Sequence, residues 1–453
     1  MSLWGPLLND SRRRPTDKKP EDQRGEFERD YDRTVYSSSF RRLKDKAQVF
    51  PLERDDFVRT RLTHSLEVSS LGRSFGIDAI KSLKNLNKLK GGDVKESDAA
   101  AILSTACLLH DIGNPPFGHF GEESIRSWFA ENIGKFGASL PVNERNDFLI
   151  FEGNAQGLRV ICYTQCLGDD KGLNLTYATL ASTIKYPCDS NSINPSPKSR
   201  SKFGFFQSEK AIFHEIQTAT QLRGKRHPLV FLVEAADDIA YSAIDVEDAL
   251  KKKSVSTELF LQFLTDHRQE SLKTYFLSEK SRYLSDGWGE SLATTMAIQR
   301  FRIEATGIMF RSCIETFCNK YDEIMSGAFS DDLISASSSR ELYLTLKTFA
   351  KKHVYSLENV LTLEIVGMKV IHGLLDIFVP AVRSGNRTNL ASADGKLFAL
   401  ISPGLKQLVN KYGDINHESD QLHLVVDYIS GMTDSFALSV YRRLTGITLD
   451  GIS

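Results

Sequence analysis

The sequence predicts an all-α, mainly helical protein. From Phe27 onward, apolar residues recur every three or four positions, as they do along the buried face of a helix. Strand-like alternation of apolar and polar residues is scarce, and no segment of roughly 20 to 50 residues repeats itself, so a solenoid is not expected. The clearest helical segments are residues 65–83, 99–109, 229–250, 258–276, 292–317, 342–349 and 424–444.

Polar and turn-forming stretches separate these helical segments. Ser97–Asp98 form an expected N-cap for the helix at 99–109. Breaks fall at 90–92, at the Ser-, Pro- and Asn-rich stretch 188–202, and at 326–340. We therefore expect a core over residues 26–250 and a further helical region, packed on that core, over residues 251–453.

Residues 1–25 are rich in charged residues and proline and poor in large apolar residues, so we expect a mobile N-terminal arm. The run Arg12–Arg13–Arg14 in this arm could touch a phosphate backbone, but a solvated tail is the simpler interpretation.

The composition is that of a globular protein with a large core. The chain has 453 residues, of which 41% are apolar and 25% are charged, and its length is typical of two or three domains. With 57 basic and 58 acidic side chains, the formal net charge is −1. No overall charge draws the protein to nucleic acid or to an anionic membrane, so binding of a polyanion would need a local patch.

The sequence predicts a cytoplasmic protein with no membrane span. No apolar run reaches the roughly 18 residues that a span needs, and the best candidate, 99–109, ends in His110–Asp111. The N-terminus lacks the apolar stretch and cleavage site of a signal peptide. The six cysteines form no C-x-x-C pair and are too few for a disulfide framework, so we expect reduced, mostly buried thiols.

The segment Leu108–Glu122, LLHDIGNPPFGHFGE, carries the strongest chemical signal. An apolar helix runs directly into His110–Asp111, and Gly113 and two prolines then stop it. A neighbouring His and Asp at a helix end can both reach one metal ion, because the chain turns there. His119 and Glu122 follow on the returning loop, at the spacing of one helical turn.

Two further segments offer additional metal ligands. His64 lies at the start of an amphipathic helix in RLTHSLEV, and Asp237 and Asp238 lie in a helix in VEAADDIAY. Hydrolysis of a phosphate ester needs a cation, an activated water and a proton-transfer group, and imidazole with carboxylate suits Mn, Fe, Mg or Zn. Each residue alone has a plainer interpretation, since a lone His is more often structural and adjacent acids are usually exposed or paired. Their combination, in this order and in these helices, favours a metal site.

The order of these residues resembles the HD superfamily of metal-dependent phosphohydrolases. More narrowly, the chain resembles the bacterial deoxyguanosinetriphosphate triphosphohydrolases (dGTPases), which are related to the animal dNTP triphosphohydrolases. The supporting segments cover nearly the whole chain, from about Phe40 to Ala437: FRRLKDKAQVFP, RTRLTHSLEV, LLHDIGNPPFGHFGE, FEGNAQGLR, GLNLTYATL with KYP, KFGFF, EAADDIAY and DYISGMTDSFA. The resemblance implies an HD-domain helical core at 26–250 and a C-terminal helical region at 251–453 that completes the pocket and makes oligomer contacts.

The resemblance also implies a ligand set for one divalent ion, Mg²⁺, Mn²⁺ or Fe²⁺. Its members are His64, His110, Asp111 and Asp237. The choice of Asp237 over Asp238 rests on the family pattern, in which the ligand lies four residues before a tyrosine, here Tyr241. Helix geometry by itself leaves both acids open.

The remaining site residues are carried over in the same way. His119 would act as the catalytic imidazole near the α-phosphate, held or charged by Glu122. Residues expected to bind the triphosphate are Arg61, Lys185, Tyr186 and Lys202. Residues expected at the deoxyribose and base are Gln48, Val49, Tyr241 and Asp245, with Asn154 in a supporting place. Asn114, also expected near substrate, stands where many relatives have His; it can donate a hydrogen bond but cannot act as an acid, and this resembles the dGTP-selective branch.

These inferences predict a dNTP triphosphohydrolase that converts dGTP and water to deoxyguanosine and inorganic tripolyphosphate by metal-assisted attack at the α-phosphate. One alternative is another HD hydrolase, such as a nucleotide monophosphatase or a cyclic-nucleotide phosphodiesterase. Another is a non-catalytic HD protein that binds nucleotides or single-stranded DNA.

The resemblance also implies partners. Relatives assemble into oligomers, commonly hexamers, so we expect a homo-oligomer. Single-stranded DNA would bind at the basic residues 12–14 or 251–253, although both are more simply solvated faces. Tyr428 and Asp434 are expected either to close the pocket or to lie between subunits.

Overall fold

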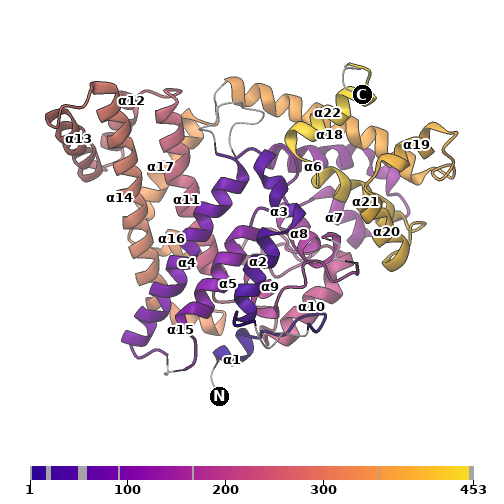
Figure 1. Cartoon of the computed structure of the whole chain (residues 1–453), viewed down its shortest axis with the longest axis horizontal. Coiled ribbons are helices and arrows are strands. Elements are labelled where there is room, and N and C mark those ends of the chain that lie inside the picture. Colours follow the sequence, from indigo (N-terminus) through magenta and orange to yellow (C-terminus); the bar gives the residue numbers. More distant parts are fainter. Residues whose placement is uncertain are drawn as a thin grey trace.

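Every regular element in the described part of the chain is a helix, which confirms the predicted all-α class (Figure 1). The computed structural model describes residues 3–16, 22–48, 59–89, 92–165, 168–356 and 358–447, and not the side chains of 359 and 360. Within these ranges, β-type pairing is limited to two isolated bridges, Arg12 with Thr176 and Ala47 with Thr60.

Among the described residues, the first of the two larger hydrophobic cores packs around α4 (Arg61–Asn85) and α5 (Glu96–Leu109). Gly76 lets these helices touch, because a Cβ there would lie 2.7 Å from the Ala100 backbone. The other helices of this core are α1 (Trp4–Leu7), α2 (Glu26–Val35), α9 (Tyr177–Thr183), α10 (Lys210–Ala219), α11 (Val230–Lys251), α12 (Thr257–Asp266), α13 (Glu270–Ser285), α14 (Glu290–Asn319), α15 (Tyr321–Ser326), α16 (Leu333–Ala336) and α17 (Arg340–His353).

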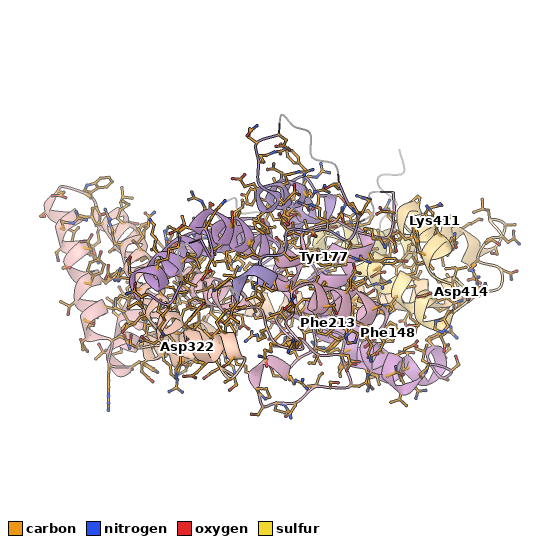
Figure 2. All side chains as sticks on the ribbon, turned by 90° about the horizontal axis from the view of Figure 1, so that it is seen from below. Phe148, Tyr177, Phe213, Asp322, Lys411 and Asp414 are labelled. Atoms are coloured by element: carbon orange, nitrogen blue, oxygen red, sulfur yellow. The ribbon has the colours of Figure 1, made fainter. Side chains whose placement is uncertain are left out.

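The second core packs α6 (His119–Phe136) against α18 (Glu358–Arg383). It also includes α7 (Val142–Leu149), α8 (Gly153–Arg159), α19 (Ala393–Leu400), α20 (Pro403–Tyr412), α21 (Glu418–Ser430) and α22 (Asp434–Leu444). Phe213 belongs to the first core and Phe148 to the second, and both are labelled in Figure 2. The molecule is elongated, with α12–α14 at one end and α19–α20 at the other (Figure 1).

Five short elements complete the described fold. They are α3 (Ser38–Arg42), the 3-10 helices η1 (Leu43–Asp45), η3 (Lys198–Arg200) and η4 (Gln207–Glu209), and the π-helix η2 (Val160–Thr164), which continues α8. Phe40 and Leu43 pack on Leu108, so α3 and η1 are fixed against the end of α5. The expected N-cap at Ser97–Asp98 is wrong, because α5 begins at Glu96 with Lys95 as its N-cap. Ser97 and Asp98 therefore lie in the first turn of the helix.

Residues 3–16 pack against the core, which differs from the expected mobile arm. Trp4 is 1% exposed, and its indole N–H donates to the Tyr321 hydroxyl at 2.8 Å. Each arginine of the basic run has an acidic partner: Asp30 and Glu26 for Arg12, Glu215 for Arg13, and Asp169 for Arg14. These charges are paired within the chain, so the run is neither a solvated tail nor a free phosphate-binding patch.

One described helix is long and apolar enough, by length and composition, to cross a membrane. It covers Leu361–Arg383 within α18, with a mean hydropathy of 1.7 and half of its window buried in the molecule. One such helix is weak evidence for a membrane span. Glu364 and Lys369 interrupt its apolar run, which is why 99–109 stands out instead in the sequence.

The described cysteines are free and buried: Cys107, Cys162, Cys188, Cys313 and Cys318. This agrees with the expectation of reduced, buried thiols for these five, and Cys166 lies outside the described residues.

Candidate active site

A cavity of about 450 Å³ lies where the two cores meet, with Phe117 of one core and Val233 of the other in its lining. Its walls come from the first turns of α4 and α6, the turn after α5, the middle of α11, and α17. The predicted site residues in the lining are Gln48, Arg61, His110, Asp111, Asn114, His119, Glu122, Asn154, Lys185, Tyr186, Lys202, Asp237 and Tyr241.

The four predicted metal ligands come together at one side of this cavity. Ligand atoms of His64, His110 and Asp111 all lie within 4.8 Å of one another. An Asp237 oxygen lies 3.2 Å from Nε2 of His64 and 3.4 Å from Nε2 of His110. The neighbouring Asp238 instead accepts a hydrogen bond from the Tyr343 hydroxyl at 2.8 Å. The orientation of α11 therefore turns Asp237 toward the two histidines and Asp238 toward Tyr343.

The donor set fits a divalent cation. Nδ1 of His110 lies 2.7 Å from the Cys107 carbonyl, so Nδ1–H donates there and Nε2 is the nitrogen that a metal ion could take in place of a proton. That Nε2 is buried without a hydrogen-bond partner among the described residues. Two imidazoles and two carboxylates are ligands that Mn²⁺, Fe²⁺, Zn²⁺ or Mg²⁺ accept.

The electrostatics of the group also favour a cation. Burial would lower the pKa of His110, but Asp111 and Asp237 raise it to about 9. Burial would likewise raise the pKa of Asp111, but Arg61 and His110 hold it well below its usual range. Despite burial, the histidines and Lys185 likewise hold the pKa of Asp237 well below its usual range, so both carboxylates are ionised.

Local sequence explains why these ligands meet. The Thr60 side chain caps α4 by accepting from the Thr63 N–H, which places His64 in the first helical turn. His110 is the C-cap of α5, so the chain turns at Asp111. Gly113 lets this turn lie directly on α8, because a Cβ there would be 2.1 Å from the Gly157 nitrogen. We call residues 110–114 the HD turn.

His119 and Glu122 occupy the first turn of α6, not the loop expected from the sequence. Phe117 and Gly118, with φ of 64° and 63°, redirect the chain into this helix. His119 is 76% exposed and its Nδ1 lies 3.7 Å from Glu122, whose side chain is 3% exposed. An exposed imidazole next to a buried carboxylate can exchange a proton with a molecule in the cavity.

Basic residues line the rest of the cavity. Arg61 donates to Asp111 at 2.5 Å, while its Nε–H is buried without a partner. Lys185 lies 4.0 Å from Asp237 and 3.9 Å from Glu234. Lys202 pairs with Glu152 at 3.0 Å, and Tyr186 lies in the same lining. These cations sit beside the metal ligands, where an anionic substrate would meet both.

The predicted sugar and base residues lie at different depths. Tyr241 lines the cavity, and its ring stacks on that of Tyr355 with centroids 6.0 Å apart. Asp245 is 3% exposed and accepts a hydrogen bond from the Tyr355 hydroxyl, so it lies behind that ring; burial raises its pKa to about 7. Gln48 lines the cavity with an unpartnered Oε1, and Val49 lies outside the described residues.

The two predicted asparagines act on carboxylates. Asn114 is buried in the lining and donates to Asp111 at 2.6 Å, so it orients a predicted metal ligand. Asn154 donates to Glu152 at 2.9 Å, beside the Lys202 contact.

The sequence prediction missed the two polar lining residues that α17 and the segment after it supply. Lys347 of α17 and Tyr355, just after it, both line the cavity. Lys347 donates to the Tyr343 hydroxyl at 3.0 Å, so it connects indirectly to Asp238. A Lys and a Tyr eight residues apart form no recognisable motif, and only the contact between α17 and α11 brings them to the site.

The residues of DYISGMTD take separate places. Asp434 accepts hydrogen bonds from the Ala47 and Phe117 N–H groups, each at 2.9 Å. It therefore fixes two backbone segments that line the active-site cavity. Tyr428 lines a different cavity.

Comparison with known proteins agrees with this architecture. Residues 61–148 match the HD domain family, and residues 395–443 match the phosphohydrolase-associated domain family. The chain is 40% identical to a deoxyguanosinetriphosphate triphosphohydrolase-like protein of Listeria monocytogenes, over 98% of this chain and 100% of the relative. A protein of the same description from Synechocystis sp. is 37% identical over 98% and 100%. A deoxyguanosinetriphosphate triphosphohydrolase of Salmonella typhi is 32% identical over 93% and 94%.

Proposed function

Because this chain belongs to the deoxyguanosinetriphosphate triphosphohydrolase-like proteins of the HD superfamily, we propose that it hydrolyses dGTP to deoxyguanosine and inorganic tripolyphosphate. The observation that carries the proposal is the placement of the metal ligands and the cations in one cavity: Asp237 contacts both His64 and His110, and it lies 4.0 Å from Lys185. A triphosphate needs several positive groups beside the metal, and this cavity offers them.

A divalent ion held by His64, His110, Asp111 and Asp237 would supply Lewis-acid stabilisation of the charge that develops at the α-phosphate. Arg61 holds Asp111 with one N–H and has a buried, unpartnered Nε–H left for a phosphate oxygen. Asn114 donates to the other Asp111 oxygen and so fixes the carboxylate from a second side.

His119 is the group that moves the proton. Its ring lines the cavity, 3.7 Å from the buried Glu122, so it is placed to pass a proton to the departing 5′-oxygen. Lys185, Lys202 and Lys347 lie in the same lining and would hold the released tripolyphosphate. Catalysis is then mainly positional and electrostatic, as in phosphoryl transfer generally.

Selection for a deoxyribose rests on the stacked rings of Tyr241 and Tyr355. Aromatic rings packed at the sugar leave no polar partner and little space for a 2′-hydroxyl. The Tyr355 hydroxyl is already bonded to Asp245, which keeps this ring in place.

Product analysis tests the proposal. The protein is incubated with each dNTP and each NTP in Mg²⁺ or Mn²⁺, and products are resolved by ion exchange. Equal amounts of deoxyguanosine and tripolyphosphate from dGTP are expected. Release of orthophosphate from nucleoside monophosphates, or opening of a cyclic nucleotide, would instead assign another HD hydrolase. Nucleotide binding without any product would assign a binding protein.

A matched pair of variants tests the metal set. Asp237→Asn removes a charge that faces both imidazoles, whereas Asp238→Asn changes the adjacent acid, which bonds Tyr343. We expect Asp237→Asn to lower turnover by more than the roughly 100-fold that loss of a supporting residue costs, and to weaken Mn²⁺ binding in calorimetry. Asp238→Asn should still bind Mn²⁺, and equal Mn²⁺ affinities in the two variants would refute this ligand set.

A further inference from the structure

A second cavity, of about 540 Å³, shares the HD turn as a wall with the active-site cavity. Asp111 and Asn114 line the active-site cavity, whereas Ile112 and Gly113, between them in the chain, line the second cavity. The other walls come from α3, α8, η2 and the segment α20–α22. The residues of that segment in the lining lie within the match to the phosphohydrolase-associated domain, so the cavity lies between the HD turn and this region.

Two buried polar side chains in its lining have unpartnered oxygens. Gln156 is 1% exposed and Ser430 is 4% exposed. Neither Oε1 of Gln156 nor Oγ of Ser430 has a hydrogen-bond partner among the described residues. The Gln156 amide nitrogen donates to Asp427 at 2.8 Å, and since a carboxylate accepts only, this fixes Oε1 as the free acceptor. Buried polar groups are normally hydrogen-bonded, so these oxygens point to a ligand that carries a donor.

The lining also holds groups that bind anions. Arg42 lies at the rim and uses one N–H for the Gly431 carbonyl at 3.1 Å, which leaves its other donors available. The N-terminus of α20 opens onto the cavity through Gly404 and Leu405, and no side chain caps this end of the helix. Uncapped N–H groups at a helix N-terminus carry partial positive charge and bind phosphate oxygens.

The nearby acids are paired within the chain. Asp427, the acidic residue in the described lining, makes contacts at 2.9 and 3.0 Å with the Arg159 guanidinium, which it shares with the buried Glu209. Asp434 lies near Lys46 and accepts two backbone N–H groups. Lys46 itself lines the cavity and donates to the Asn114 and Ser430 carbonyls at 2.5 and 2.7 Å. The cavity therefore presents positive and neutral polar groups to a ligand.

We propose that this cavity binds a phosphorylated small molecule, with its phosphate held by Arg42 and the start of α20 and a hydroxyl or amine donor on Gln156. The volume exceeds the needs of a bare phosphate and lies in the range of about 300 to 1,000 Å³ that holds small organic ligands. None of the groups assigned to dGTP hydrolysis takes part, so this site stands independently of the proposed reaction.

Calorimetric titration with ribose 5-phosphate tests the proposal, with ribose and inorganic phosphate as comparison ligands. Arg42→Gln removes the rim cation, and because Arg42 is exposed this variant should fold. Arg41→Gln, the matched control, changes an adjacent exposed arginine that does not line the cavity. Lys185→Gln alters the active-site cavity alone.

We expect ribose 5-phosphate to bind the unmodified protein more tightly than either comparison ligand. Arg42→Gln should weaken this binding about tenfold or more, which is the loss of a charge-assisted hydrogen bond. Arg41→Gln and Lys185→Gln should bind as the unmodified protein does. Three results would each overturn the site: no binding of ribose 5-phosphate, unchanged affinity in Arg42→Gln, or a loss confined to Lys185→Gln.

Discussion

Replacing Arg126 with methionine should lower both stability and turnover, because this arginine is the shared counter-charge of two buried carboxylates. Its Nη2 lies 3.2 Å from Glu122 and 3.4 Å from Glu152, and its Nε–H donates to the Phe151 carbonyl at 2.7 Å. The two carboxylate side chains are only 3% and 4% exposed. Methionine keeps the length of the side chain and removes the charge and all four hydrogen bonds, the fourth of which runs to the exposed Glu123.

The magnitude follows from this burial. Removing one partner of a fully buried ion pair costs about 3–5 kcal/mol of the free energy of unfolding. Arg126 is 29% exposed, and Glu152 keeps Lys202 at 3.0 Å. We therefore expect a smaller loss, about 1–3 kcal/mol, for Arg126→Met.

Turnover should change through Glu122. Burial would raise the pKa of Glu122, but His119, Lys202 and Arg126 together hold it below its usual value. Without Arg126 the pKa of Glu122 rises, so this carboxylate becomes protonated at a higher pH and loses its negative charge beside His119. The acidic limb of kcat/KM should move to higher pH, and kcat should fall by about tenfold to a hundredfold as the pair loses its position.

Urea unfolding and the pH dependence of kcat/KM measure the two effects. Arg126→Lys should restore part of both, because the charge returns without the second hydrogen bond. Glu123→Gln is the matched control: Glu123 is 71% exposed and touches the same guanidinium at 3.4 Å, so its loss should cost less than about 0.5 kcal/mol. An Arg126→Met protein with unchanged unfolding free energy and an unshifted acidic limb would refute the reasoning.

Three further predictions test the frame around the site. Gly76→Val should force α4 away from α5, because its Cβ would lie 2.7 Å from the Ala100 backbone, and it should cost at least about 1–3 kcal/mol in urea unfolding. Burial raises the pKa of Asp147 to about 7, so the folded protein favours the protonated carboxyl. The free energy of unfolding should therefore fall as pH rises from about 4 to 7, and Asp147→Asn should flatten that fall in unfolding measured across this range. Tyr355→Phe keeps the ring but leaves Asp245 without its donor, and should cost about 1–3 kcal/mol in thermal unfolding.

Much of the metal site follows from local sequence. The periodicity of α4, α5 and α11 is plain, and a His-Asp pair at a helix end followed by glycine and proline predicts a turn with two ligands on it. What periodicity cannot supply is the rotation of α11 relative to α4. The choice between Asp237 and Asp238 depends on that rotation, because the two acids differ by about 100° around the helix.

The N-terminal segment shows the opposite case. Its composition is that of a disordered tail, and nothing within residues 3–16 predicts a partner. Trp4 is fixed by Tyr321, 317 residues further along, and Arg12 by Asp30 and the Asn174 carbonyl. A few long-range contacts with buried groups are therefore enough to order this polar segment. Such contacts cannot be recognised from the local sequence pattern.

Long-range contacts also explain why the sequence could place the C-terminal region near the site but could not assign roles to its residues. Lys347 and Tyr355 reach the cavity through helix packing, and Asp434 acts by accepting the N–H groups of Ala47 and Phe117. Phe117 has a positive φ, which costs energy for a residue with a side chain and persists only when other contacts impose it. Asp434 provides one such contact, just before the helix that carries His119. Because the strained entry to α6 depends on this carboxylate, the C-terminal region is part of the construction of the active site and not a separate unit packed beside it.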